Sequence, residues 1–286
     1  MLAKAKTTDE NREREFLFTD RDFKSIASLV HEKAGISLSE QKRELVYSRL
    51  SRRLRVLNLK KFSDYMRLVV ADDSSDEMGH FINAITTNLT SFFRESHHFD
   101  HLAKSVVSPL ANGSNAGRKE LLVWSAGCST GEEPYSIAMT IANGLPDWKN
   151  HNVRILATDL DTNAVAACKR ATYRHESLKQ IPRELSKQFL IDGIAESVRI
   201  NPDLQRMISF KQLNLRGAWP MRRQYDVIFC RNVMIYFDDA FKTELLNGFH
   251  SLLKPGGYLY IGHSESASKL HSGYDLIGRT IYERRS

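Results

Sequence analysis

The sequence predicts an α/β protein in which a helical N-terminal domain precedes a doubly wound, mostly parallel sheet. Two observations predict this class. Apolar residues recur at helical spacing through the first third of the 286-residue chain. After Gly113, short apolar strands alternate with helical segments, which is the pattern of a parallel sheet covered by helices. We therefore expect a helical domain over 16–100 and the sheet within 101–286.

Four helices are expected in the N-terminal domain. The first starts after Thr19. The second is capped by Ser37, with a glutamate three residues on completing a capping box, or alternatively by Ser39. The third covers about 62–70, and the fourth starts near Ser75.

The remainder of the sequence predicts strands separated by helices. A small β-subdomain is expected at about 181–212, where the alternation lapses, and the last segment is expected to add antiparallel strands. Three helices are expected between these strands. The first ends at about 143, the second starts at about 162, and the third covers about 239–253. The expected strands are 121–125, 154–158, 226–230 and 258–262.

The composition, 42% hydrophobic and 26% charged, is typical of a soluble globular protein. No stretch approaches the ~18 consecutive apolar residues of a membrane span, and the N-terminus lacks the apolar segment of a secretory signal. Cys128, Cys168 and Cys230 are widely spaced, without a C-x-x-C, which argues against disulfides or zinc and favours the reducing cytoplasm. We expect residues 1–15 to be a mobile polar tail.

A basic patch lies in the second expected helix. Eight basic residues occur between Lys42 and Lys61, against Glu44 alone. On a helical wheel Lys42, Arg49 and Arg53 cluster, with Arg52 beside them. Such a face is either a solvated surface or a docking site for an acidic partner.

The first expected strand ends in the loop G-C-S-T-G, which two glutamates follow. A helix N-terminus attracts phosphate, but Glu132 and Glu133 would repel it, and the loop has no lysine or arginine. A dinucleotide or ATP is therefore disfavoured, whereas a cationic nucleoside without phosphate, such as S-adenosylmethionine, fits better. The alternative is that Glu133 only completes a capping box with Thr130.

Polar residues also follow two other strands, and the carboxyl ends of such strands face the ligand cleft. Asp159 suits ribose hydroxyls, although Asp159 or Asp161 could instead cap the next helix. Arg231 and Asn232 end a further strand, with Tyr236 one helical turn on. The alternative for Arg231 is a buried side chain that braces the loop against a carboxylate.

Two other motifs are set aside. His97, His98 and His101 have metal-like spacing, but no carboxylate or thiol set accompanies them, so we expect a solvated helix face and no metal. The stretch G-H-S-E-S at 262–266 lacks the second glycine of a hydrolase elbow.

Four stretches resemble the chemotaxis receptor methyltransferases, which are S-adenosylmethionine-dependent protein-glutamate O-methyltransferases. The resemblance spans nearly the whole chain and implies a Rossmann-like class I methyltransferase sheet, a helical N-terminal domain and a small β insertion. The stretches are TTNLTSFFRE (86–95), VWSAGCSTGEEPYSIA (123–138), IFCRNVMIYFD (228–238) and LLKPGGYLYIGHSES (252–266).

The resemblance also implies site residues. The basic helix, with Arg49, Arg52 and Arg53, is expected to meet the cytoplasmic helical region of transmembrane chemotaxis receptors. Arg94 and Tyr236 are our candidates for orienting the substrate carboxylate. The implied cofactor contacts are Asn88, Thr90, Arg94, Glu133, Asp159, Asn214, Leu215, Arg231 and Asn232.

The expected reaction is methyl transfer from S-adenosylmethionine to receptor glutamates, which forms methyl esters and S-adenosylhomocysteine. A glutamate with a pKa of about 4.3 is already ionised at pH 7, so no general base is needed. We expect a cytoplasmic monomer with no nucleic-acid partner and no membrane insertion. The alternatives are methylation of another acidic or nucleic-acid substrate, and a receptor-bound adaptor that transfers nothing.

Overall fold

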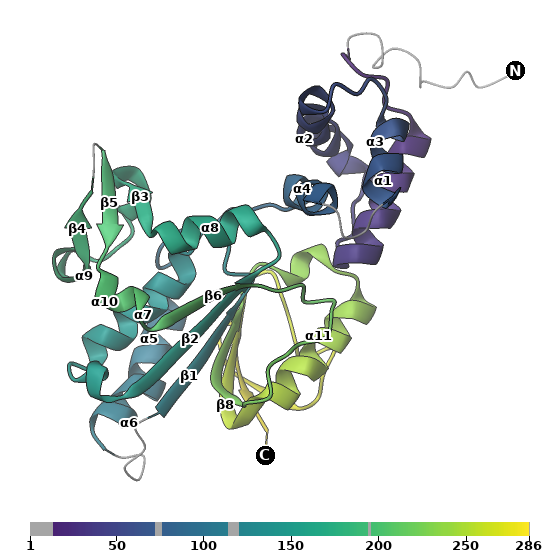
Figure 1. Cartoon of the computed structure of the whole chain (residues 1–286). Coiled ribbons are helices and arrows are strands. Elements are labelled where there is room, and N and C mark those ends of the chain that lie inside the picture. Colours follow the sequence, from purple (N-terminus) through teal and green to yellow (C-terminus); the bar gives the residue numbers. More distant parts are fainter. Residues whose placement is uncertain (1–13, 72–75, 114–119, 194–195, 286) are drawn as a thin grey trace, which may run out of the picture. The chain divides into compact units, whose positions relative to one another are not determined.

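The computed structural model describes residues 14–71, 76–113, 120–193 and 196–285. The chain divides into two compact units, Met1–Thr86 and Thr87–Ser286 (Figure 1). This division falls before the expected boundary at residue 100, because Phe92 and Phe99 are buried in the core of the second unit. Most of the expected tail, residues 1–13, lies outside the described residues.

The first unit is helical, as predicted. Thr19 caps its first helix through a capping box with Asp22, and Gly35 ends that helix with a φ of 71°. Among the described residues, no helix is both long and apolar enough to cross a membrane. The helices of this unit are α1 (Asp20–Ala34), η1 (Glu40–Lys42), α2 (Arg43–Val56), α3 (Phe62–Ala71) and α4 (Asp76–Ile85).

The start of the second helix predicted at Ser37 was wrong, whereas the alternative, Ser39, is the residue that precedes the first helical turn. A 3₁₀ turn, η1, follows Ser39, and the α-helix begins only at Arg43. The Ser39 side chain makes no capping hydrogen bond. The capping box expected at Ser37 is absent from the described residues, since a different type of turn occupies the first residues of the expected helix.

The second unit contains a seven-stranded sheet in the order β6-β2-β1-β7-β8-β10-β9. The first five strands of this order are parallel to one another, and β10 and β9 extend the sheet through antiparallel pairing, as predicted. The strands are β1 (Glu120–Ala126), β2 (Asn152–Asp159), β6 (Ile208–Gln212), β7 (Tyr225–Cys230), β8 (Leu253–Ile261), β9 (Tyr274–Gly278) and β10 (Ile281–Arg284).

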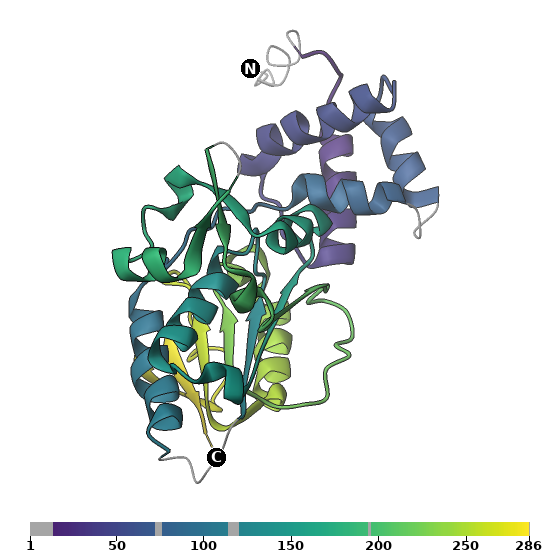
Figure 2. The ribbon, with the colours of Figure 1, turned by 60° about the vertical axis from the view of Figure 1, so that its left-hand side comes forward.

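Helices cover both faces of this sheet. The helix α11 packs on one face, and the group formed by α5, η2 and α7 packs on the other (Figures 1 and 2). The helical segments are α5 (His97–His101), the π-helical η2 (Leu102–Val107), α6 (Ser108–Ala111), α7 (Glu132–Gly144), η3 (Trp148–Asn150), α8 (Thr162–Arg170), η4 (His175–Leu178), α9 (Arg183–Phe189), α10 (Pro202–Gln205), η5 (Met234–Tyr236) and α11 (Asp239–Leu252).

The strands β1 and β7 lie at the centre of the sheet. Every residue of β7, and every residue of β1 after the first, is buried, which explains their continuous apolar sequences. The strand order reverses between these two strands, because the chain continues from β1 to β2 on one side and from β7 to β8 on the other. The carboxyl ends of the parallel strands therefore share one edge, with the switch point between β1 and β7.

The inserted subdomain is a three-stranded antiparallel sheet in the order β3-β5-β4. Its strands are β3 (Thr172–Arg174), β4 (Leu190–Asp192) and β5 (Ser197–Ile200). It therefore begins before the expected residue 181. The segment β6, which the expected range 181–212 included, belongs to the main sheet because Ile208 pairs in parallel with Ile155.

Candidate active site

The loop after β1 lies between the ends of its two neighbouring strands. The amides of Gly127 and Cys128 both donate to the carbonyl of Thr158, in β2, at 2.8 and 2.9 Å. Gly127 has a φ of 78°, and a Cβ there would lie 2.4 Å from a methyl group of Val233, which follows β7. Glycine is needed here because the two loops touch at the switch point.

Glu133 points toward the switch point. One carboxylate oxygen accepts a hydrogen bond from the Ser125 hydroxyl at 2.7 Å, and the other accepts from Arg231 at 3.1 Å. The helix α7 starts after Gly131 without a side-chain cap, so the alternative capping box with Thr130 does not form. Burial raises the pKa of Glu133, and the charge of Arg231 offsets part of this rise.

The other carboxylates at this edge are also buried. Glu132 accepts a hydrogen bond from the Thr130 hydroxyl at 2.6 Å, and burial raises its pKa. Asp159, at the end of β2, likewise has a pKa raised by burial. The loop and the adjacent strand end thus present acidic groups to a ligand, and the sequence of the loop supplies no lysine or arginine to bind phosphate.

The two aspartates after β2 have different roles. Asp161 caps α8 through the amides of Asn163 and Ala164, so the alternative of a capping aspartate holds for Asp161. Asp161 also accepts a hydrogen bond from the side chain of Asn88 at 2.7 Å. Asp159 accepts instead from the amides of Ser129, at 2.7 Å, and Asp161, at 2.9 Å. Asp159 therefore holds the β1 loop against the end of β2.

Arg231 lies between two carboxylates. Its side chain is 3.1 Å from Glu133 and 3.5 Å from Glu95, and it also donates to the main-chain carbonyl of Arg94. Only 6% of Arg231 is exposed. The structure shows the alternative role: Arg231 is a buried side chain that braces the loops against carboxylates. These contacts tie the segment around Arg94 to the end of β7.

Arg94 itself has a half-buried side chain. One guanidinium nitrogen donates to the carbonyl of Leu89 at 3.0 Å. Across the ranges that the structure describes, Arg94 forms no ion pair. The segment that carries Asn88 and Thr90 therefore also carries an arginine that has no acidic partner among the described residues.

The turn after β7 is held by Glu265. Its buried carboxylate accepts hydrogen bonds from the amides of Asn232, at 3.0 Å, Ile235, at 3.2 Å, and Gly262. Asn232 has a φ of 59°, and half-buried Tyr236 ends the short helix that follows. The sequence prediction missed Glu265, which belongs to the discarded G-H-S-E-S motif. Its place just after β8 was the signal that could have found it.

Asn214 and Leu215 follow β6 at the same edge. Gln212 pairs with Asp159, and the amide of Leu213 donates to the Asp159 carbonyl at 3.0 Å. The side chain of Asn214 accepts from the Arg216 amide at 3.0 Å. These contacts place Asn214 and Leu215 close to the end of β2. Their contact with the cofactor is implied by the resemblance alone.

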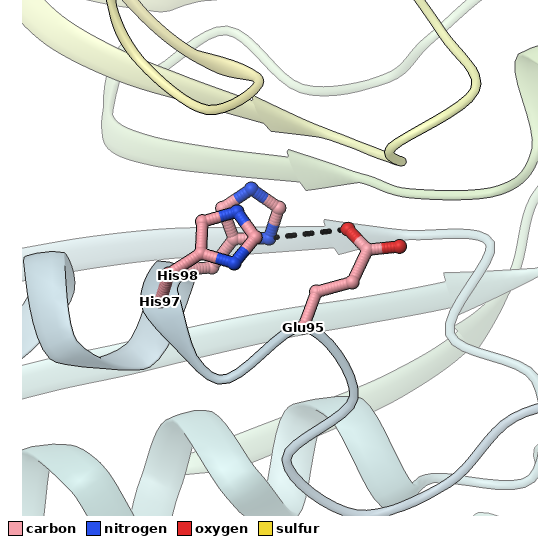
Figure 3. A group of neighbouring side chains, drawn as sticks. All are labelled: Glu95, His97 and His98. Carbon is pink, nitrogen blue, oxygen red and sulfur yellow. Dashed lines mark ion pairs between the residues drawn. The ribbon is translucent and has the colours of Figure 1, made fainter.

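The histidines near the start of α5 are not the solvated face that we expected. His98 is fully buried, and Glu95 lies beside it and His97, with possible ligand atoms within 4.8 Å of one another (Figure 3). The expectation that no carboxylate accompanies these histidines was wrong, because Glu95 approaches from the preceding turn. Burial lowers the pKa of His98 to about 3, so this ring is neutral at pH 7.

The groups in this cluster have protein partners. Glu95 is 2.8 Å from the imidazole of His263, and its other oxygen is 3.5 Å from Arg231. His97 and His98 contact the Arg279 carbonyl and the Thr280 hydroxyl at 3.0 and 3.1 Å. The guanidinium charge beside Glu95 opposes a second cation. We therefore assign Glu95 to the network around Arg231.

Of the three arginines expected to dock a substrate, Arg49 and Arg53 form hydrogen bonds within the first unit. Arg53 forms two hydrogen bonds with Glu77, at 3.0 and 2.5 Å. Arg49 donates to the carbonyls of Ile85 and Thr86, both at 2.7 Å, at the carboxyl end of α4. Arg52 alone of the three is exposed. The basic helix face thus serves the fold as well as any partner.

A parallel sheet with a glycine loop after β1, buried carboxylates at its carboxyl edge and two closing strands in antiparallel pairing fits a nucleoside-binding transferase of the methyltransferase class. Comparison with known families agrees. The family described as "CheR methyltransferase, SAM binding domain" matches residues 88–282, and "CheR methyltransferase, all-alpha domain" matches residues 21–86. The chain belongs to the CheR methyltransferase family and is an enzyme that uses S-adenosylmethionine.

Relatives match over most of their length. The chain is 43% identical over 274 residues to the chemotaxis protein methyltransferase of Escherichia coli K12, which covers 92% of this chain and 91% of the relative. It is 42% identical to that of Klebsiella aerogenes, over 92% and 89% of the two chains. It is 41% identical to chemotaxis protein methyltransferase 2 of Pseudomonas aeruginosa, over 94% and 95%. The family resemblance, the fold class and the cofactor are confirmed.

Proposed function

We propose that this enzyme methylates glutamate side chains in the cytoplasmic helical region of transmembrane chemotaxis receptors, which yields glutamate methyl esters and S-adenosylhomocysteine. The observation that carries this proposal is the similarity to chemotaxis protein methyltransferases, which covers 92% of this chain and both of its units. The roles of single residues rest on the contacts at the strand ends.

The strand-end edge fits the cofactor. Asp159 accepts two amide hydrogen bonds, and a carboxylate has about four acceptor sites, so capacity for ribose hydroxyls remains. Glu133 and Arg231 form a pair of opposite charges, which is complementary to an amino-acid group that carries an ammonium and a carboxylate. The proposed cofactor contacts are Asn88, Thr90, Arg94, Glu133, Asp159, Asn214, Leu215, Arg231 and Asn232.

When bound, S-adenosylmethionine supplies a sulfonium methyl group that a carboxylate oxygen can take directly. Arg94 and Tyr236 orient the substrate carboxylate. Arg94 is suited to this role because it has no acidic partner among the described residues. Its contact with Leu89 restrains the guanidinium, so it can guide the substrate without the tight ion pair that would stabilise the ground state. Catalysis then comes from orientation and the exclusion of water.

The test uses methyl-labelled S-adenosylmethionine and a receptor cytoplasmic fragment. We expect label on the fragment that is released by mild base, as a carboxyl methyl ester would be. A matched fragment with alanines in place of its methylated glutamates should take up no label. Base-stable label or label on added RNA only would support the alternative substrates, and no transfer at all would support an adaptor; each result contradicts the proposal.

We further propose that the enzyme works in the cytoplasm as a monomer and that Arg52, the exposed arginine of α2, contributes to receptor docking. Sedimentation of the full chain at micromolar concentration tests the monomer, since a dimer would sediment as a species of twice the 32.7 kDa mass. Nucleic acid is not expected to compete with the receptor fragment.

A further inference from the structure

Tyr173 connects the inserted β-subdomain to the loop after β1. It is the central residue of β3, and it is 8% exposed. Its hydroxyl donates a hydrogen bond to the main-chain carbonyl of Thr130 at 2.8 Å. A side chain of the subdomain thus satisfies a carbonyl in the loop that separates β1 from α7.

Gly131 leaves the space that this hydroxyl occupies. A Cβ at Gly131 would lie 2.6 Å from the Tyr173 hydroxyl oxygen and 3.1 Å from the sulfur of Cys168. Gly131 also has a φ of 105°, which L side chains rarely adopt. The second glycine of the G-C-S-T-G loop is therefore explained by the approach of Tyr173 and by backbone conformation, in addition to any approach of a ligand.

The Tyr173 ring contacts a second segment of the site. Its centroid is 5.0 Å from that of Phe92, with the two rings at 80°. Phe92 is fully buried and lies between Thr90 and Arg94, both of which belong to the proposed site. Tyr173 therefore touches two segments of the site: the β1 loop, which leads into the helix of Glu133, and the segment that carries Thr90 and Arg94.

We propose that Tyr173 is a positioning residue through which the inserted β-subdomain holds the β1 loop in its cofactor-binding shape. This inference rests on the proposed cofactor site. The loop contains three residues with positive φ, Gly127 at 78°, Ser129 at 51° and Gly131 at 105°, and the conformation of Ser129, which is not a glycine, persists only when surrounding contacts hold it. A loop that is already ordered loses less conformational freedom when the cofactor binds, so the hydroxyl of Tyr173 favours affinity.

Tyr135 provides a matched control. Its hydroxyl also donates to a main-chain carbonyl at 2.8 Å, and its ring is fully buried. The acceptor is Cys168, in α8, and not the β1 loop. Replacing either tyrosine with phenylalanine removes one buried hydrogen bond of the same length, but only Tyr173→Phe removes one that the β1 loop itself accepts. In Tyr135→Phe, Cys168 keeps its own contact with that loop, because its thiol donates to the Ser129 carbonyl at 3.1 Å.

The experiment compares Tyr173→Phe and Tyr135→Phe in the full chain. KM for S-adenosylmethionine should rise about three- to tenfold in Tyr173→Phe and less than twofold in Tyr135→Phe, as expected for one hydrogen bond. Melting temperatures should fall by similar amounts. KM for the receptor fragment and kcat at saturating cofactor should stay within about twofold of wild type in both.

Two outcomes overturn the inference. An unchanged cofactor KM in Tyr173→Phe shows that the loop does not need the hydroxyl, and an equal rise in both variants shows a general loss of order. Direct titration of the wild-type protein with S-adenosylmethionine distinguishes a failure of this inference from a failure of the proposed function. Wild-type binding with an unaffected Tyr173→Phe defeats only the inference, whereas a wild-type protein that does not bind defeats the proposed site as well.

Discussion

The strand-end edge of the second unit and the arginine face of α2 were both predicted from charged residues, but they differ in how those charges are used. At the strand ends, Glu95, Glu133 and Arg231 come from distant parts of the sequence and meet in one network. On α2, Arg49 and Arg53 lie on a common face as predicted, yet their guanidinium groups contact α4. Parallel topology determines where strand ends meet, whereas a charged helix face does not specify its partner.

The two networks also differ in burial. The side chains of Arg231 and Glu133 are 2% and 10% exposed, against 20% and 11% for Arg53 and Glu77. Removing one member of a buried ion pair leaves the other charge without compensation, and the cost is large. Removing a member of a more exposed pair costs less, because water and salt screen the remaining charge.

The largest expected effect is that of Arg231→Met. This variant keeps the volume but leaves Glu133 and Glu95 without their cation, so we expect a loss of about 3–5 kcal/mol in the free energy of unfolding. Urea denaturation followed by tryptophan fluorescence reports on this unit alone, because all three tryptophans lie within 87–286.

The pH dependence of Arg231→Met is a second measurement of the same effect. Burial raises the pKa of Glu133, and Arg231 holds it down in part. Without Arg231 the pKa rises further, so the carboxyl is neutral at low pH and charged without a partner at high pH. The destabilisation should therefore be smaller at about pH 5 than at about pH 8. A loss that does not depend on pH would show that packing, and not charge, explains it.

The next largest effect is expected for Arg94→Ala. Its side chain is half-buried and forms no ion pair in the described part of the chain, so stability should change little. Methyl transfer to the receptor fragment should fall by about 100-fold, or about 2.7 kcal/mol in the barrier, because substrate orientation is lost. Turnover of the purified variant checks this, and unchanged turnover would defeat the assignment of Arg94.

The comparison explains what the sequence could predict. Asp159 and Arg231 were found because each follows an apolar strand, and parallel strands place their carboxyl ends at one edge. Glu95 and Glu265 were missed because their partners are far along the chain: His263 and Arg231 for the first, and main-chain amides for the second. No local pattern encodes the contacts of Glu95, whereas the position of Glu265 just after β8 was a usable signal.

The same limit applies to element boundaries. Local composition placed β6 in the inserted subdomain, but pairing with β2 decides which sheet a strand joins. The start of α1 after Thr19 was correctly predicted, and the capping box that Thr19 forms with Asp22 lies within four residues. Contacts that depend on another element were predictable only where topology brings strand ends together, and even within one helical turn the capping box expected at Ser37 did not form.

The smallest expected effect separates Arg52 from Arg53. Arg52→Gln should raise KM for the receptor fragment about three- to fivefold at low salt, with little effect in high salt, because exposed charges mainly steer association. Arg53→Gln should instead lower the free energy of unfolding of the first unit by about 1–2 kcal/mol, because Glu77 loses its partner. Circular dichroism at the helical minimum detects this loss, while tryptophan fluorescence should not change. If Arg53→Gln raised the receptor KM without a loss of stability, docking would be its main role after all, and the contrast between the two regions would disappear.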